Sequence, residues 1–209
     1  MKKALAILLT AVMLLGVLTA CGSKKDDAAD DTQNTEGADK AAADNVAALI
    51  DAIYVQERTD ETDAQCEAAK AAWDALTDEQ KSMVEGEEAS PEYFGLDTGD
   101  ASKDDPRNQD DIGENELLVV SFGTSYNDSR VKDIKNIEDA LQEAYPDWSV
   151  RRAFTAQIII NHIQARDGEK IDNMTQALDR AVANGVKNLV VQPTHLMHGA
   201  EYDLSLIHI

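Results

Sequence analysis

His195 follows directly after a strand-like apolar run, in the segment LVVQPTHLMHGAEY (189–202). The run Leu-Val-Val at its start predicts a short strand that stops at Pro193. In an open α/β sheet, the loop that leaves the carboxyl end of a strand is where ligands bind. A neutral imidazole in that loop can ligate a divalent metal or accept a proton near neutral pH. A solvated loop histidine is the simpler alternative, so the surrounding elements have to decide between the two.

The other histidines carry weaker chemical signals. His198 follows His195 by three positions, so the two rings share a face only if this segment is helical. His162 lies on an apolar helical face with Ile158 and Ile163, which favours a packed or partly exposed ring. His208 falls in residues 204–209, whose sequence LSLIHI resembles the short non-native tails of translated adapter sequence. We expect residues 204–209 to belong to no domain and give His208 no role.

Strand and helix patterns alternate from Glu116 onward. Strand-like runs cover residues 117–122, 148–154 and 188–192, and helical patterns cover residues 128–144, 158–163 and 171–184. Thr155 stands where it can cap the second helix, and Gly185 stands at the expected C-cap of the third. This alternation predicts an α/β fold with a parallel sheet and right-handed crossovers.

Polar loops of small residues follow all three predicted strands, at residues 121–127, 153–157 and 194–202. Because the carboxyl ends of parallel strands meet at one edge, these loops should converge on one crevice. The first loop, SFGTS, lacks the glycine spacing and the lysine of a phosphate-binding loop. Its small residues would still let a large planar ligand approach the backbone.

Four motifs in this half of the chain resemble a known family. LLVVSFGTSYNDSR (117–130), RAFTAQIII (152–160), RDG (166–168) and PTHLMHGAEY (193–202) are similar, in order and spacing, to the anaerobic sirohydrochlorin cobaltochelatases, a class II chelatase-like family. The resemblance implies that residues 116–203 form one of two similar α/β lobes that hold a tetrapyrrole between them. His195 matches a metal-binding histidine, whereas His198 stands where we expect asparagine. The family's remaining metal ligands, a glutamate and a second histidine, lie in a C-terminal half that this sequence does not reach.

The resemblance also implies a tetrapyrrole substrate and cobalt(II) as the substrate metal, with iron(II) left open and no organic cofactor. Metal insertion removes two pyrrole protons, so His195 is the candidate catalytic proton acceptor as well as the metal ligand. Sirohydrochlorin carries eight carboxylates, which require positive charge or backbone donors. The expected substrate-binding residues are Gly123, Thr124, Ser125, Arg152, Phe154, Thr155, Glu201 and Tyr202. Arg151, next to Arg152, is expected to be solvated at the sheet edge.

Residues 1–21 are predicted to be a lipoprotein signal peptide. Lys2 and Lys3 precede an apolar run that ends Leu-Thr-Ala-Cys, which closely matches the lipobox whose cysteine, here Cys21, is acylated. The run is shorter than the ~20 residues of a spanning helix. We therefore expect an extracytoplasmic protein held at a membrane by its lipid chains. Cys66 is then left without a disulfide partner, and its alanine-rich helical setting predicts a small buried residue.

Acidic residues are concentrated in the first half of the mature chain. The formal net charge is −21, and residues 22–115 hold 27 acidic and 8 basic side chains. Nucleic acid is not an expected partner, since no basic stripe is present. Residues 22–43 and 87–115 are predicted acidic linkers, flexible over 23–43 and 97–113. Between them, residues 44–86 predict a small all-α module with a capping box at Thr77, which serves as a spacer or packing module.

Three functions remain open at this point. The first is a membrane-tethered cobaltochelatase of cobalamin biosynthesis that lacks its second lobe and is inactive in this form. The second is a non-catalytic tetrapyrrole- or metal-binding surface lipoprotein that passes its cargo to a transporter. The expected location favours this carrier, because cobalamin precursors are made in the cytoplasm. The third is a structural surface protein with a decayed chelatase domain. A homo-oligomer is left open in each case.

Overall fold

A computed structural model describes the backbone of residues 30–55 and 57–207. The chain divides into two compact units, Met1–Glu36 and Gly37–Ile209. The expected signal peptide at residues 1–21, with Cys21, lies outside the described residues, as does His208. Within the described part of the chain, no helix combines the length and the hydropathy needed to cross a membrane.

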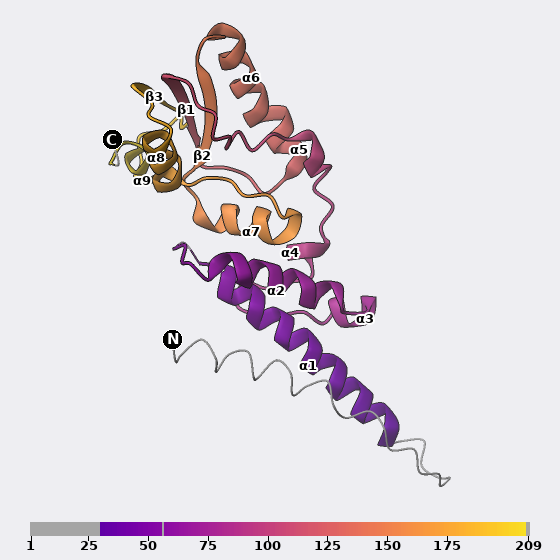
Figure 1. Ribbon diagram of the computed structural model, residues 1–209. Helices are drawn as coiled ribbons and strands as arrows, with labels where there is room; N and C mark the ends of the chain where they lie inside the picture. Colours follow the sequence, from indigo (N-terminus) through magenta and orange to yellow (C-terminus); the bar gives the residue numbers. More distant parts are fainter. Residues whose placement is uncertain (1–29, 56, 208–209) are drawn as a thin grey trace, which may run out of the picture. The chain divides into compact units, whose positions relative to one another are not determined.

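The predicted α/β fold with a parallel sheet is confirmed (Figure 1). Strands β1 (Asn115–Ser121), β2 (Ser149–Phe154) and β3 (Asn188–Pro193) pair in the order β2-β1-β3, and both pairings are parallel. The central strand β1 is buried along its apolar length, as a strand covered on both faces should be. The edge strand β3 is far more exposed, and Val190 keeps 46% of its surface accessible.

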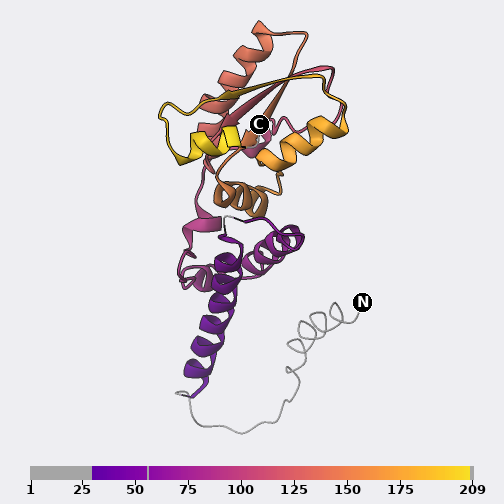
Figure 2. The same ribbon diagram turned by 90° about the vertical axis from the view of Figure 1, so that its left-hand side faces the viewer.

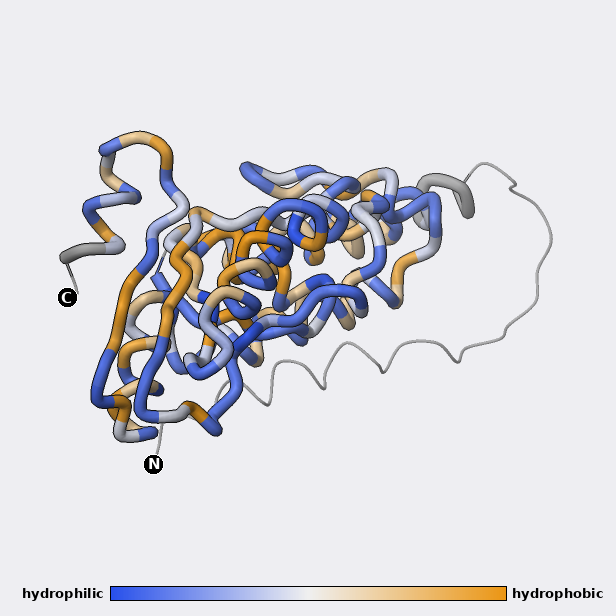
Figure 3. The backbone as a smooth tube through the Cα atoms, turned by 90° about the horizontal axis from the view of Figure 1, so that it is seen from above, coloured by the Kyte–Doolittle hydropathy of each residue, from blue (hydrophilic) through white to orange (hydrophobic). Residues whose placement is uncertain are grey.

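Helices cover both faces of the sheet (Figure 2). Alternate β1 side chains point in opposite directions. Leu117 and Val119 pack with α6 (Lys135–Ala144), whereas Leu118 and Val120 pack with α8 (Met174–Ala183). In Figure 3 the hydrophobic residues of the sheet lie along the strands themselves. These two apolar layers bury both faces of the sheet, and the polar loops lie at its carboxyl edge.

The helix termini differ in part from the sequence prediction. The expected single helix over residues 128–144 is α5 (Asn127–Ser129), a π-helical turn η2 (Arg130–Ile134) and α6. Helix α7 (Gln157–Asp167) has Ala156 as its N-cap, so Thr155 does not cap it. Helix α8 begins at Met174, after the Asn173 capping box, and Gly185 follows its end with a positive φ of 71°, as its predicted C-cap role requires. Helix α9 (Ala200–Ile207) follows β3.

The all-α part contains α1 (Asp30–Ile53), α2 (Thr62–Asp74), α3 (Asp78–Lys81) and α4 (Glu92–Gly95). Helix α1 begins well before residue 44, so residues 30–43 of the expected flexible linker are helical. Ala43, at the end of this segment, already belongs to the buried face that continues through Val46 and Ile50. The Thr77 capping box is confirmed, and so is the burial of Cys66, which raises the pKa of its thiol to about 11.

Helices α1, α2 and α4 share one hydrophobic core with α7, which Figure 2 shows between them and the sheet. The buried Asn161 amide of α7 donates to the carbonyl oxygens of Ile53 and Val55, at 3.0 and 3.1 Å. The His162 ring stacks on Tyr93 with centroids 4.1 Å apart, and its Nε2 lies 2.6 Å from the Tyr93 carbonyl oxygen. The predicted packed histidine is therefore confirmed.

The second expected flexible linker is a structured strap. Residues 97–113, called the strap below, contain the turn η1 (Ala101–Lys103) and the buried Ile112. The Arg107 carbonyl oxygen accepts a hydrogen bond from Arg152 N at 3.2 Å, so the strap covers the free edge of β2. The flexible-linker prediction fails here because the strap's charges are paired with the α/β lobe rather than solvated.

Asp104 is the centre of that pairing. Its carboxylate accepts hydrogen bonds from Arg130 Nε at 2.8 Å and from Arg152 Nη1 and Nη2 at 2.7 and 3.0 Å. Glu138 of α6 accepts from the same Arg152, twice at 2.8 Å. All four side chains are fully buried. Burial alone would raise the pKa of Asp104, but Arg152 and Arg130 outweigh it and lower that pKa.

Two predictions about the paired arginines are wrong. Arg152 was expected to bind substrate, but its guanidinium is fully buried between Asp104 and Glu138. Arg151 was expected to be solvated, but it is fully buried on the opposite face, where Nη2 lies 2.7 Å from Glu116 Oε1. Both expectations fail because the strap and the helices cover what would otherwise be an open sheet edge.

Replacing Asp104 with asparagine tests the strap. Asp104→Asn leaves two buried cations with one carboxylate fewer, which should lower the free energy of unfolding by about 3–5 kcal/mol at pH 7. Since the folded-state pKa of Asp104 is lowered, its contribution is present above the unfolded value of about 3.9 and is lost as the pH falls through the folded value. Urea titrations at pH 7 measure the loss, with the exposed Asp111→Asn as control. Equal midpoints for Asp104→Asn and wild type would contradict this account.

His162 makes stability depend on pH. Burial, reinforced by the nearby Arg166, lowers the pKa of His162 to about 4, despite the Tyr93 carbonyl. Below pH 6.5 the His162 ring takes up a proton in the unfolded chain but stays neutral in the folded chain. The free energy of unfolding therefore decreases as the pH falls from 6.5 towards 4. Between pH 7 and pH 5 the wild type should lose about 2 kcal/mol more than His162→Gln. Urea titrations at both pH values measure this, with the exposed His198→Gln as control, and parallel losses in all three proteins would refute it.

Candidate functional site

The three loops at the carboxyl edge of the sheet meet, as the topology predicts. Thr155 N donates to the Ser121 carbonyl oxygen at 2.9 Å, which joins the loops after β2 and β1. Thr194 N donates to the Val120 carbonyl oxygen at 2.9 Å, and the Thr194 hydroxyl lies 2.9 Å from the Ser121 hydroxyl. The end of β1 is therefore the common attachment point, and the loops after β2 and β3 are fixed to it on either side.

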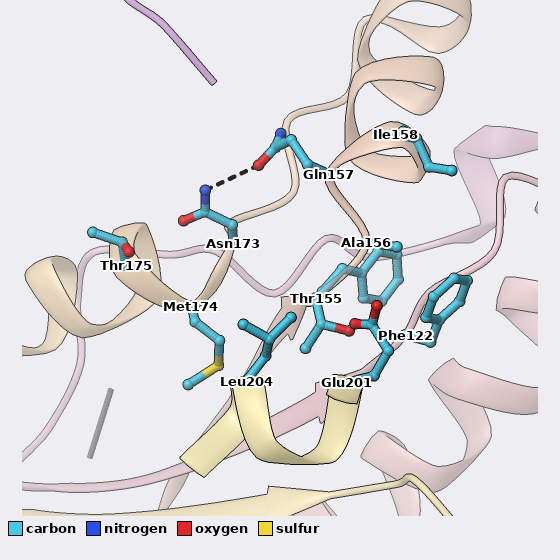
Figure 4. A pocket seen from close by; sticks show the side chains of 11 residues that line it. Phe122, Thr155, Ala156, Gln157, Ile158, Asn173, Met174, Thr175, Glu201 and Leu204 are labelled. Carbon is cyan, nitrogen blue, oxygen red and sulfur yellow. Dashed lines mark hydrogen bonds between the residues drawn. The ribbon is translucent and has the colours of Figure 1, made fainter. Parts of the chain in front are cut away.

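A pocket of about 240 Å³ opens at this edge (Figure 4). The loop after β2 lines it with Thr155, and α9 lines it from the opposite side with Glu201 and Leu204. Pockets that enclose a drug-sized ligand hold about 300–1,000 Å³. This pocket is smaller than that range, so it can enclose only part of a ligand of that size.

Several polar atoms at this edge are shielded from solvent and, within the described part of the chain, have no hydrogen-bond partner. They are Thr155 Oγ1, Glu201 Oε2 and both ring nitrogens of His195. Leaving such a group unpaired costs about 1–3 kcal/mol, so each one requires an explanation. A ligand that supplies donors and acceptors at this edge would satisfy them.

The structure brings only some of the predicted residues together. Thr155 and Glu201 line one pocket, whereas His195 follows β3 and does not belong to that lining. His198 has a side chain that is 77% exposed, and its ring contacts Tyr202, with centroids 4.4 Å apart. Over residues 35–55 and 57–205, no group of three or more His, Cys, Asp or Glu side chains is arranged to hold a metal ion.

Gly123 is required by the close packing of the first loop. Its φ is +99°, a conformation that favours glycine, and a Cβ there would lie 2.5 Å from Phe154 Cδ2. Phe154 itself is fully buried in a cluster with Ile160 and Ile163, although it contributes to the pocket wall. The substrate contact expected of Phe154 therefore stays a prediction: the ring lines the pocket and is otherwise buried. Its ring is held beneath the loop by apolar packing.

Two exposed aromatic residues at the ends of this loop were missed by the sequence analysis. Phe122 is 43% exposed and Tyr126 is 52% exposed, and the half-buried Gly123, Thr124 and Ser125 lie between them. Phe122 also lines the pocket. An exposed aromatic ring offers a face on which a flat ligand can stack. The signal was present in the sequence as an aromatic residue on each side of Gly-Thr-Ser.

Comparison with known proteins points to the same segment. Residues 115–208 match the family of cobalt chelatases described as Cobalt chelatase (CbiK). The chain is also 44% identical over 87 residues to the sirohydrochlorin cobaltochelatase of Salmonella typhimurium, which is 42% of this chain and 33% of that enzyme. The matched part thus spans about a third of the length of this curated relative. The segment that is similar to cobalt chelatases is the one that forms β1, β2, β3 and the three loops that meet at their carboxyl ends.

Proposed function

We propose that residues 116–203 form the N-terminal lobe of a chelatase that inserts cobalt(II) into a sirohydrochlorin-type tetrapyrrole. The observation that carries this proposal is the coincidence of two facts. The segment similar to cobalt chelatases supplies the loops at the carboxyl edge, and polar atoms without partners are concentrated at that edge. An edge of this kind is where an open α/β sheet binds its ligand.

In this proposal the flat macrocycle lies across the mouth of the pocket. Phe122 and Tyr126 offer exposed rings on which it can stack. The amides of Gly123 to Ser125 and the Thr155 hydroxyl donate hydrogen bonds to its carboxylates. Tyr202 lies next to Glu201 on α9, and its ring contacts His198 of the preceding loop. Glu201 Oε2 has a free lone pair that can accept a hydrogen bond from a pyrrole N–H.

His195 is the proposed metal ligand and proton acceptor. Neither of its ring nitrogens has a partner in the described residues, so one lone pair is free to hold the incoming cobalt(II) ion or to take a pyrrole proton. Insertion of a divalent metal releases two protons from the ring, and an imidazole can accept them one at a time if it gives up the first before it takes the second. An imidazole holds cobalt(II) less firmly than a thiolate would, which permits transfer of the metal to the ring.

The carrier function remains the second candidate, because residues 1–21 match a lipoprotein signal. A carrier outside the cytoplasm would use the same edge to bind a ring without turning it over. The two functions differ in stoichiometry, since an enzyme forms many metallated rings for each protein and a carrier forms at most one.

Replacing His195 tests the enzyme function. The assembled protein, which includes the second lobe that the family resemblance implies, is mixed with sirohydrochlorin and cobalt(II) without oxygen, and the metallated ring is followed by absorbance. His195→Ala should lower the insertion rate at least about 100-fold, the usual loss for a missing proton acceptor, while ring binding persists. His198→Ala serves as the matched control and should keep the wild-type rate. A wild-type rate in His195→Ala would refute the role of His195, and a wild-type yield of one metallated ring or fewer for each protein would favour the carrier.

We also propose that the protein is tethered to a membrane outside the cytoplasm through lipid on Cys21. In cells fed a labelled fatty acid, the wild-type protein should carry the label and sediment with membranes, because two or three acyl chains anchor a protein stably. Cys21→Ser should lose the label and leave the membrane fraction, whereas Cys66→Ser should keep both properties. A Cys21→Ser protein that is labelled and sediments like wild type would show that the tether is elsewhere.

A further inference from the structure

Two arginines hold the loop between β1 and α5 from below. Arg166 Nη2 donates to the Ser125 carbonyl oxygen at 2.6 Å, and Arg130 Nη1 donates to the Thr124 carbonyl oxygen at 3.1 Å. Both guanidinium groups also donate to Oδ1 of the buried Asn127, whose Nδ2 donates to the Gly99 carbonyl oxygen at 3.2 Å. Two consecutive carbonyl groups of the loop are therefore drawn towards fixed positive charges.

The arginines are themselves fixed in place. Arg130 is fully buried and bonds Asp104, and Arg166, with a side chain only 8% exposed, bonds Asp167 at 2.6 Å. A guanidinium group can make several bonds at once from one rigid plane, which lysine cannot do. Each arginine can thus hold a loop carbonyl and a carboxylate together, and the loop has little freedom to turn over.

This arrangement has a consequence for the loop amides. In a trans peptide the N–H points opposite to the C=O, so the inward Thr124 carbonyl directs the Ser125 N–H outward. Tyr126 N donates to the Thr124 hydroxyl at 3.2 Å. In the described part of the chain, the N–H groups of Gly123, Thr124 and Ser125 donate to no hydrogen-bond acceptor. The free donors lie between the exposed rings of Phe122 and Tyr126.

We propose that Arg166, together with Arg130, is a positioning residue that holds this loop so that the Ser125 amide receives a carboxylate arm of the ring. The inference rests on the proposed function, because it assigns a role to residues behind the same loop. Neither arginine touches the ligand. Arg130 bonds the Thr124 carbonyl and so orients the peptide that carries the Ser125 N–H, whereas Arg166 bonds the Ser125 carbonyl and fixes the next peptide, on the other side of Ser125. The positive charge behind these peptides strengthens the pull of the Ser125 N–H on an anion.

The effect should depend on the number of carboxylates on the ring. Metal-free uroporphyrin, with eight carboxylates, and deuteroporphyrin, with two, serve as probes of the full-length protein, and fluorescence titration gives their dissociation constants. Wild type should prefer uroporphyrin. Arg166→Lys should weaken uroporphyrin binding about tenfold, the value of one hydrogen bond to a charged group, and should change deuteroporphyrin binding little. Arg180→Lys is the matched control, since Arg180 also bonds carboxylates, at Asp172 and Asp110, and does not contact the loop.

A second variant removes the donor and leaves both arginines in place. Ser125→Pro lacks the backbone N–H and should reproduce the selective loss of uroporphyrin binding. Urea midpoints establish which variants are folded. If Arg166→Lys does not fold, the porphyrin affinities of Ser125→Pro test the positioning role. Equal weakening of both porphyrins, or no weakening of either, would overturn the positioning role.

A small-anion probe separates this inference from the proposed function. Glutarate is titrated into isotope-labelled protein, and the amide resonances of Gly123, Thr124 and Ser125 are followed. If wild type binds neither porphyrin, the proposed function fails. The positioning role would still hold if glutarate shifts the Ser125 resonance in wild type and not in Arg166→Lys. An unshifted wild-type Ser125 resonance in glutarate would overturn the positioning role whatever the porphyrins do.

Discussion

Two adjacent arginines on one edge strand impose the main constraint on this structure. Arg151 and Arg152 follow each other in β2, so their side chains leave opposite faces of the sheet, and both are fully buried. Each buried cation requires a carboxylate nearby, because an unpaired charge in the interior would cost several kcal/mol. Glu116 and Asp172 serve Arg151 on one face, and Glu138 and Asp104 serve Arg152 on the other. The strap, α6 and the start of α8 are thereby tied to one strand.

Sequence patterns predicted the elements of the α/β lobe well and the charged interior poorly. Alternating apolar runs predicted β1, β2 and β3 and the helices between them, since burial of one face leaves a periodic trace. Charges leave no such trace. Asp104 and Arg152 are 48 positions apart, and an acidic stretch looks the same whether solvent or arginines surround it. The strap was therefore taken for a flexible linker, and Arg152 for a residue that was free to bind a ligand.

At the candidate site, too, the sequence predicted the arrangement of the elements but not the positions of individual side chains. The meeting of three loops followed from the topology alone, because parallel strands bring their carboxyl ends to one edge. Which side chains face the mouth did not follow. Phe154 was expected there and lies beneath Gly123, whereas Phe122, one residue before that glycine, is exposed. A loop of a few residues has no hydrophobic period, so the sequence does not show that Phe154 packs against Ile160 and Ile163 beneath Gly123 while Phe122 stays exposed.

The strap also shows that the segment shared with related proteins and the segment needed for folding start at different residues. The similarity to cobalt chelatases starts at residue 115, yet the carboxylate of Asp104, which neutralises Arg130 and Arg152, is contributed from outside that stretch. The unit that is shared with relatives and the unit that folds therefore have different lengths. A recombinant protein that began at residue 115 would bury the guanidinium groups of Arg130 and Arg152 without the carboxylate of Asp104. A version of this lobe that folds by itself therefore has to begin before the segment that its relatives share.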